Sequence, residues 1–447
     1  MTNYINKGKP IRVVVMYYAL FIIGSMFVLK LPFLFQDGMS ITWLEAFFTS
    51  NSSIATTGLT VFDFQETYNY LGWLALIVLF NIGGMGIIVL NILIMFILGK
   101  KLGLRYRNLA KMDINQNGVP NILTIVKGVV IFFLVFEVIG AFLIFIFSFG
   151  MYDSFSEHFM NSIFLSASAT SGSGFFNFLP YANNYPIRYI TMILMTFSYI
   201  GFPVILESYQ FVKFHKNKTK GRFRFSRFTK IVVWVNAITI FIFTIIFFML
   251  ERNNTMVEMG LYEQVNTSLF MAMSTKSVGL NLFEDISLWN PLTLLLSAIF
   301  MVIGGSPSSA CGGIKVVSVY IIFKYVIATM KGKKRVVSYQ TLIPEDTVVK
   351  SFLLVFVFIT ISFIAAILIS AMHSSLSLTI IWYDVISGFT TTGFSVGGLE
   401  HFNNLSIFLM SILMGVGRIG IMNILNLAGG VNSELENVSY VEADISV

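Results

Sequence analysis

The chain has 447 residues, of which 56% are hydrophobic and only 11% are charged, and its formal net charge is +7. A soluble domain averages about 45–50% apolar and about 25% charged residues, so this composition excludes an ordinary cytosolic enzyme, a disordered protein and a fibrous protein. It leaves a membrane protein that crosses the bilayer several times, and the placement of its positive charge then becomes informative.

Eight apolar segments are long enough to cross a bilayer as helices, which takes about 20 residues. They cover residues 13–35, 72–99, 122–150, 188–212, 230–250, 291–329, 350–372 and 404–430. The first could be mistaken for a signal peptide, but its apolar run is too long, Lys30 stands at its far end and no small-residue cleavage site follows. We therefore predict that it is a span.

A shorter segment lies between the two members of each pair of spans. Each holds some 10–14 moderately apolar residues followed by a cluster of Gly, Ser and Thr, which is typical of a re-entrant or buried helix. These segments cover residues 40–57, 157–173, 261–278 and 377–392. The sequence thus predicts an all-α membrane protein with eight transmembrane helices and four re-entrant pore helices.

Basic residues gather in four loops and thereby predict the orientation of the chain. Residues 7–12, 100–111, 213–230 and 324–350 together hold 22 of the 29 Lys and Arg residues. With eight spans all four loops fall on one side, which the positive-inside rule makes the cytoplasm, together with both termini. Acidic residues gather on the other side: Asp37, Asp63, Glu66, Asp153, Glu157, Glu284 and Asp285. The charge therefore reflects topology, and we expect contact with lipid headgroups but no nucleic-acid partner.

A unit of span, short helix, glycine-bearing loop and span occurs four times, over residues 1–111, 112–227, 228–340 and 341–447. The third unit contains the interrupted sixth span, and the fourth ends in an acidic tail. Because an even number of crossings separates the units, they run parallel. Four parallel repeats predict a pseudo-fourfold axis along the membrane normal, with the four short helices converging on a central pore.

The four loops after the short helices are similar to one another. They read ATTGLTVF (55–62), SGSGFFNF (171–178), KSVGLNLF (276–283) and TTTGFSVG (390–397). Their equivalent glycines, which lie 116, 105 and 114 residues apart, are Gly58, Gly174, Gly279 and Gly393. One such loop alone is compatible with an ordinary outer turn, whereas four at near-equal spacing between paired spans indicate a repeated function.

The predicted arrangement favours a cation at its centre. A re-entrant helix that enters from outside places its C-terminal end, with about half a negative charge, near the middle of the membrane. The loop that returns can aim carbonyl oxygens at the axis, where they replace the hydration shell of an ion. Glycine suits this loop because it adopts positive φ values and has no Cβ to block the pore.

No catalytic or metal-binding motif accompanies this pattern. Cys311 is the only cysteine, so no intrachain disulfide can form. The four histidines are scattered, and the sequence lacks HExxH, CxxC, Walker A and nucleophile-elbow motifs. We therefore expect no enzyme, and no cofactor or metal apart from a transported ion.

Four motifs carry a resemblance to a known family. NIGGMG (81–86) lies in the second span, and GGSPSSACGGIK (304–315) interrupts the sixth. GVGRIG (415–420) lies in the last span, and STKSVGLN (274–281) contains the third glycine loop with a basic residue before it. Together, at these places within four repeats, the motifs make the chain similar to the Ktr/Trk/HKT superfamily of potassium transporters. It most resembles the membrane subunit of a bacterial Ktr system, over essentially the whole chain.

The resemblance implies a role for each matching position. The potassium selectivity filter would consist of Thr57, Gly58, Ser173, Gly174, Val278, Gly279, Thr392 and Gly393. All four glycine positions hold Gly, whereas in plant relatives a Ser at the first favours sodium. The gating loop below the filter would comprise Gly304, Gly305, Ser306, Pro307, Ser308, Ser309, Ala310, Cys311, Gly312, Gly313 and Lys315. Arg418 would project toward the pore and help to form the gate.

The residue types are compatible with these roles. A stretch with four Gly, three Ser, a Pro and a Cys cannot remain a helix, and such a break at membrane depth should line a cavity. Arg418 is costly at membrane depth, so it is either functional or paired with loop carbonyls. Lys315 either joins the gate or extends to the cytoplasm. We expect Lys276 to pair with an acid or with carbonyls outside the filter, Cys311 to be a small packing residue and Glu137 to be buried and hydrogen-bonded.

Three segments depart from the family pattern. They are SYIGFPV (198–204) in the fourth span, SGSGF in the second filter loop and the Pro within SPSSAC of the gating loop. These departures leave open the backbone of the second filter segment and the stiffness of the gate.

We therefore predict potassium uptake through a channel-like pore, driven by the membrane potential, with sodium dependence left open. The alternatives are a sodium-selective pore of the same family, a secondary transporter with a midplane substrate site and an intramembrane enzyme. A secondary transporter would have inverted repeats and two broken spans, and only the sixth is clearly broken in the sequence. The family implies a homodimer with a cytosolic ring of nucleotide-binding RCK-type subunits, and the acidic tail (433–447) would end inside and support the dimer.

Overall fold

A computed structural model describes residues 10–86, 122–176, 184–218, 221–333 and 335–428. These residues are mostly helical, and the strands among them are the two-residue pair β1 (Val337–Ser338) and β2 (Thr341–Leu342), which form an antiparallel hairpin. The prediction of a helical membrane protein is confirmed at this level. The predicted boundary at 111/112, the basic loop at 100–111 and the acidic tail lie outside the described residues.

The helices follow one another in a recurring order of a first helix, a short helix and a second helix. The first helices are α2 (Pro10–Leu29), α8 (Ile122–Phe147), α12 (Arg227–Glu251) and α16 (Glu345–Met372). The short helices are α3 (Trp43–Ala55), α9 (Phe155–Ser171), α13 (Leu261–Ser274) and α17 (Leu378–Phe389). The second helices are α5 (Tyr70–Gly84), α10 (Tyr185–Ile200), α14 (Pro291–Val302) and α18 (Asn404–Ile419).

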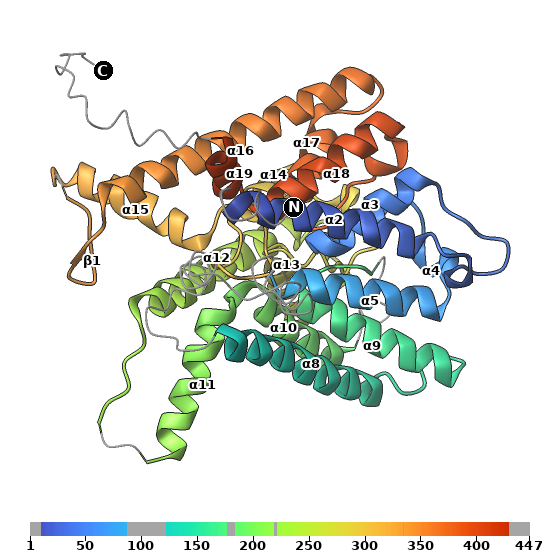
Figure 1. Ribbon diagram of the computed structural model, residues 1–447, viewed down its shortest axis with the longest axis horizontal. Helices are drawn as coiled ribbons and strands as arrows, with labels where there is room; N and C mark the ends of the chain where they lie inside the picture. The colour runs from blue at the N-terminus through green and yellow to red at the C-terminus, as the bar shows by residue number, and fades with distance from the viewer. Residues whose placement is uncertain (1–9, 87–121, 177–183, 219–220, 334, 429–447) are drawn as a thin grey trace, which may run out of the picture.

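Several of these helices, including α2, α5, α8, α9, α16 and α18, run along the long axis of the molecule in Figure 1. Helical turns in the loops at one end complete the fold: η1 (Pro32–Leu34), α4 (Phe64–Thr67), η2 (Ile286–Leu288) and η3 (Leu399–His401). Helices α11 (Phe202–Lys216), α15 (Val316–Met330) and α19 (Ile421–Ala428) follow three of the second helices.

Many polar side chains are buried inside the molecule, while apolar side chains cover much of its outside. In α3 a run of five polar residues, Thr49 to Ser53, is at most 2% exposed. The first helices instead show apolar side chains to the outside, and only 22–28% of the most apolar part of α8, α12 and α16 is buried within the protein. This distribution suits a protein whose outer solvent is hydrocarbon.

Three helical stretches of the described chain are long and apolar enough to cross a membrane. They are Lys127–Phe147, Arg227–Glu251 and Glu345–Met372, and the bent pair of α10 and α11 would make a fourth. These stretches belong to first helices, whereas the second helices are short, at 12 to 16 residues.

Two of the second helices, α10 and α18, end at breaks where continuous spans were predicted. Helix α10 ends at Ile200, and α11 leaves it at an angle of 110° after Gly201, which has a φ of 81°. Helix α18 ends at Ile419 and the chain re-enters a helix after Gly420, at a φ of 87°. The predictions of unbroken spans over 188–212 and 404–430 are therefore wrong, as is the expectation that only the sixth span is clearly broken. The predicted span over 72–99 is described only to residue 86.

Candidate functional site

Three of the four short helices begin at polar residues that fix their starting points. Thr42 forms a capping box with Glu45 at the start of α3, and the side chains of Ser154 and Ser377 cap α9 and α17. Such caps satisfy the first amide groups of a helix and each contribute about 1 kcal/mol. Gly260 precedes α13 without a side-chain cap.

All four short helices are followed by the same backbone conformation. The second residue before each predicted filter glycine has a positive φ: Thr56 (54°), Gly172 (71°), Ser277 (120°) and Thr391 (55°). The glycines themselves follow this pattern: Gly58 (83°), Gly174 (66°), Gly279 (70°) and Gly393 (100°). Residues other than Gly seldom adopt such angles, so the surrounding structure holds the three non-glycine residues in place. The second loop, whose backbone the sequence left open, shares this pattern.

Hydrogen bonds close the end of each short helix. In three loops the residue before the glycine donates its N–H to a carbonyl five residues earlier, over 2.8–3.0 Å: Thr57 to Ser52, Ser173 to Ser168 and Thr392 to Ser387. In the third loop Val278 and Gly279 both donate to Ser274. Closures of this type satisfy the carbonyl groups at the helix end. The carbonyl oxygens of Thr57, Ser173, Val278 and Thr392 accept no hydrogen bond from any described residue.

The four glycines lie in a closed ring. A Cβ built on each glycine would collide with the carbonyl oxygen of the residue before the glycine of the next loop. The four contacts run from Gly58 to Ser173, from Gly174 to Val278, from Gly279 to Thr392 and from Gly393 to Thr57. The structure therefore brings all eight predicted filter residues together, and it leaves no room for a side chain at any of the four glycines.

A cavity of about 800 Å³ opens on one side of this ring, and all four glycines line it. The residues that follow the glycines form much of its wall, and its acidic residues are Asp63, Glu284, Asp285 and Glu400. The described lining includes one histidine, His401, and no Lys or Arg. The cavity therefore attracts cations toward the ring.

The predicted gating loop lies on the other side of the ring. Residues 303–315 separate α14 from α15, and they contact the chain just before two of the glycines. Thr56 donates its hydroxyl to the carbonyl of Ala310 over 3.1 Å, and the N–H of Gly312 donates to the hydroxyl of Thr391 over 2.9 Å. The loop is thus tied to the first and fourth filter segments.

The same loop fills the break between α10 and α11. The N–H groups of Ser306 and Ala310 donate to the carbonyls of Tyr199 and Ser198, each over 2.9 Å. Cys311 is buried, and its thiol lies 3.7 Å from the Ser198 carbonyl. The interruption of the fourth span therefore provides backbone partners for the gating loop, and Cys311 is a small packing residue as expected.

Two lysines hold this loop through backbone carbonyls. Lys276 is 2% exposed and donates to the carbonyl of Ile303, where the loop begins, over 3.1 Å. Lys315 donates to the carbonyl of Cys311 over 2.5 Å. Of the two expectations for Lys276, pairing with carbonyls is the one found, and Lys315 bonds to the loop itself.

Arg418 lies at the end of α18 and is 8% exposed. It donates to the carbonyl of Gly83 near the end of α5, and its Nε has no partner among the described residues. The neighbouring Gly417 packs so closely that a Cβ would collide with the carbonyl of Phe389. The arginine therefore joins the second helices of the first and fourth units.

Two buried carboxylates lie away from the ring glycines. Glu137 of α8 is 6% exposed and accepts hydrogen bonds from the Asn81 amide at 3.0 and 2.9 Å, which confirms the expected buried, hydrogen-bonded role. Asp384 of α17 is fully buried and accepts from the N–H of Val396 over 3.0 Å and from the hydroxyl of Ser395 over 3.2 Å. Asp384 was not predicted as a functional residue, although it is an acid in an apolar segment, the same signal that points to Glu137.

Comparisons with known proteins agree with this fold and site. The chain matches the TrkH family, described as a cation transport protein, over residues 11–431. It is 32% identical to the Ktr system potassium uptake protein D of Bacillus subtilis, over 95% of this chain and 94% of that protein. It is 28% identical to the Ktr system potassium uptake protein B of Vibrio alginolyticus, over 93% and 90% of the two chains.

A solved structure shares the fold. The potassium transporter TrkH from Vibrio parahaemolyticus superposes with a TM-score of 0.73, at 18% sequence identity, over 94% of this chain and 85% of that one. At this identity the likeness concerns the fold alone. The family match and the Ktr-type relatives together lead to one conclusion: this chain belongs to the TrkH family of cation transport proteins.

Proposed function

We propose that the chain takes up potassium through a channel-like pore between four parallel repeats, with its selectivity filter at the glycine ring. The observation that supports this proposal is the closed ring itself: four carbonyl groups accept no hydrogen bond from the described residues, and the four glycines pack so closely that no side chain would fit. Rings of backbone carbonyls replace the hydration shell of a potassium ion. The two Ktr-type relatives described above are potassium uptake proteins, which favours this ion over sodium.

The electrostatics of the site favour a cation throughout. Each of the four short helices ends next to the ring, and a helix C-terminus carries about half a negative charge. The acids of the outer cavity raise the local concentration of cations before they reach the ring. An anion would meet unfavourable potential at both places.

In this proposal residues 304–315 are the gate. They lie on the inner side of the ring and consist mostly of small residues, so they obstruct a hydrated ion and are able to move aside. The loop is held by hydrogen bonds to Thr56, Thr391 and α10, and by Lys276 at its start. Arg418, between α18 and α5, adds a positive charge near the inner end of the pore.

The driving force would be the membrane potential, which contributes about 2.3 kcal/mol per charge per 100 mV. No ATP-hydrolysing site is then needed in this chain. We infer a cell-membrane location with both termini in the cytoplasm, a homodimer, and a separate nucleotide-binding regulatory ring of RCK type. The proposal leaves the sodium dependence of uptake open, and the chain itself would carry no cofactor.

Growth of cells that lack potassium uptake tests the proposal. The chain is expressed together with the regulatory subunit of a Ktr system, and we expect it to restore growth at low potassium. Failure to restore growth, with the protein present in the membrane, would contradict the proposal. A sodium-selective pore, the main competitor, would raise cellular sodium without restoring growth.

Substitution of the first ring glycine tests the filter assignment. In Gly58→Ser the new Cβ meets the Ser173 carbonyl, and a φ of 83° is strained for Ser by roughly 1–2 kcal/mol. We expect potassium-over-sodium selectivity to fall severalfold, measured as the ratio of uptake rates. Gly38→Ser is the matched control, because Gly38 has a φ of 80° but nothing within 4 Å of its Cβ position. Equal selectivity in the two variants would remove Gly58 from the filter.

A further inference from the structure

Helix α11 and the extended segment at 221–226 form an arm that projects sideways from the helix bundle. The chain turns by 110° at Gly201 and runs into α11, which crosses the direction of α8 in Figure 1. The arm returns at Ser226, the N-cap of the spanning helix α12. Because it returns directly into the start of a span, the arm lies at a membrane boundary and not deep in the aqueous phase.

The arm is held together by its own side chains. Phe223 and Phe225 of the extended segment pack against Phe211 of α11, with ring centroids 5.5 and 5.2 Å apart. Glu207 accepts hydrogen bonds from the N–H and the hydroxyl of Ser226, at 2.7 and 2.9 Å. These contacts give the arm a defined shape, although little of it packs on the bundle.

The outer half of α11 shows apolar groups to its surroundings. From Ser208 to Lys218 every residue except Phe214 is exposed, and the exposed fractions of Tyr209 and Val212 reach 63% and 61%. An isolated helix of 15 residues is marginally stable in water. Exposed apolar residues on a helix at a membrane boundary are covered when the helix lies in the interface.

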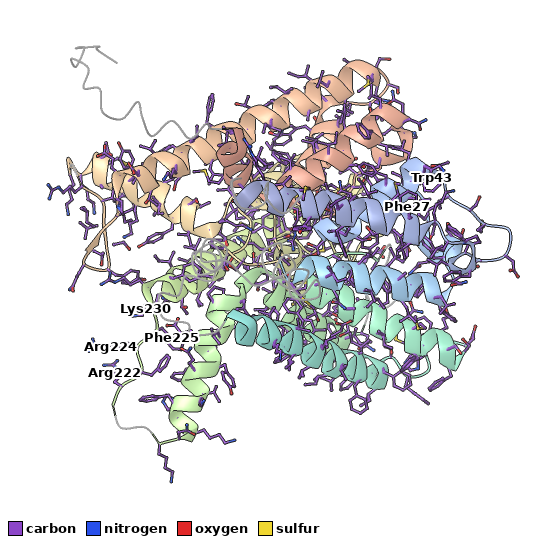
Figure 2. The ribbon with its side chains drawn as sticks, viewed as in Figure 1. Phe27, Trp43, Arg222, Arg224, Phe225 and Lys230 are labelled. Atoms are coloured by element: carbon purple, nitrogen blue, oxygen red, sulfur yellow. The ribbon has the colours of Figure 1, made fainter. Side chains whose placement is uncertain are left out.

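The charge of the arm is strongly positive. Lys213, Lys216, Lys218, Arg222 and Arg224 are all exposed, and none forms an ion pair within the described part of the chain. Glu207 is the one acidic residue of the described arm, and its carboxylate is hydrogen-bonded to the N–H and the hydroxyl of Ser226. Figure 2 shows Arg222 and Arg224 directed away from the bundle, while Phe225 points toward α11.

The position of the arm indicates which leaflet of the membrane it contacts. It lies near β1, at the end of the molecule away from α4, and Asp63 beside α4 lines the acidic cavity. The arm is therefore on the side of the membrane opposite to the cavity. By the positive-inside rule this side is the cytoplasm, whose leaflet carries anionic lipid and attracts juxtamembrane Lys and Arg.

We propose that the α11 arm is an interfacial anchor that binds anionic phospholipid headgroups of the cytoplasmic leaflet. Tyr209 and Val212 enter the acyl boundary, and the basic residues contact lipid phosphates. The alternative occupants, a second copy of the chain or a cytosolic protein, would cover the charges but would not place Val212 in hydrocarbon. The inference goes beyond ion conduction, since it would hold whichever cation the pore selects.

Lipid quenching of a fluorescent probe on the arm tests the proposal. The full chain carries Cys311→Ser and Val212→Cys, labelled with an environment-sensitive fluorophore, in nanodiscs that contain brominated lipid. We expect strong quenching when the discs contain phosphatidylglycerol. Quenching should fall to about half or less in discs of phosphatidylcholine alone, and it should weaken as salt screens the charges.

A four-charge variant and its matched control complete the test. Lys213→Gln, Lys216→Gln, Arg222→Gln and Arg224→Gln together should reduce quenching in phosphatidylglycerol as strongly as the change of lipid does. Neutralising the four basic residues near the β-hairpin instead, Lys331, Lys333, Arg335 and Lys350, should leave it unchanged. Two quenching results would each overturn the proposal: equal quenching in both lipids, or no quenching in either. A disulfide between two copies of the unlabelled Val212→Cys variant, together with no quenching of the labelled one, would also overturn it, because it would show that a second copy covers the arm.

Discussion

Asp384 shows how one side chain can fix the geometry of the fourth glycine loop. Its carboxylate is fully buried in α17 and accepts from Val396 and Ser395, on the segment that leads outward from Gly393. A Cβ on Gly398 would lie only 2.5 Å from its Oδ2 atom, so the loop folds tightly around the carboxylate. The corresponding positions of the other three units, nine residues before each glycine, hold Thr49, Leu165 and Phe270. The fourth loop therefore has a support that the others lack.

We expect Asp384→Asn to lower potassium-over-sodium selectivity. Asn keeps the shape of Asp but replaces one acceptor oxygen with a donor that faces other donors, and loss of a hydrogen bond to a charged group costs roughly 1.5–3 kcal/mol. The ratio of potassium to sodium flux in proteoliposomes measures the effect. Asp37→Asn, at an exposed position outside the ring, should leave the ratio unchanged. A folded Asp384→Asn protein with the original ratio would show that Asp384 does not position the filter.

At the scale of elements, the contacts between residues 304–315 and the glycine loops predict which residues would keep the proposed gate closed. Thr391 accepts from Gly312 and Thr56 donates to Ala310, so both hydroxyls hold the loop against the ring. The double variant Thr56→Val and Thr391→Val keeps the shape of both side chains and removes both hydrogen bonds. Each bond contributes about 0.5–1.5 kcal/mol, so the loop should open more often.

We expect a several-fold rise in potassium flux into proteoliposomes for this double variant, with the flux ratio of the two ions preserved. Thr360→Val is the matched control, because Thr360 lies exposed on α16 and bonds only to its own helix at Phe356. A higher flux in the control as well would point to a general effect on folding or insertion. An unchanged flux in the double variant would argue against residues 304–315 as the gate.

The interrupted helices show which elements the sequence alone can predict. The short helices are predictable because a polar cap begins most of them and a cluster of small residues ends them: α3 begins at Trp43, where 40 was expected, and α17 ends at Phe389, where 392 was expected. The break at Gly201 was missed, because a single Gly within an apolar run costs only about 1 kcal/mol in a helix. Its positive φ depends on residues 303–315, which are distant in sequence and occupy the break.

The candidate site likewise has one part that the sequence predicts and another that it does not. The four ring glycines were predictable because their loops repeat, but the contacts that close the ring are made between units, and no local pattern encodes them. The partners of Lys276 and Arg418 were left as alternatives for the same reason. Both side chains donate to backbone carbonyls of helix ends or loops, and any residue type can supply such a carbonyl.

For the whole molecule, the proposed function places the outer cavity, the ring and residues 304–315 one after another along a single route for the ion. In the proposed function the acids of the cavity would concentrate cations, the ring would replace their water and the membrane potential would drive them. A potential of 100 mV supplies about 2.3 kcal/mol per charge, which corresponds to an accumulation of about 50-fold. On the proposed function, we expect transport to be passive, electrogenic and independent of ATP within this chain.

Proteoliposomes loaded with potassium and diluted into a potassium-free medium test this behaviour. Potassium that leaves through the protein should make the interior negative and, once a protonophore is added, draw protons in, which a pH-sensitive dye reports. Vesicles loaded with sodium should give a much smaller signal. Gly279→Ala should abolish the signal, because its Cβ would meet the Thr392 carbonyl, whereas Gly260→Ala has open space around its Cβ and should preserve it. A flux that requires ATP would contradict a passive pore, and a flux that appears only with sodium on the opposite side would show obligatory coupling between the two ions.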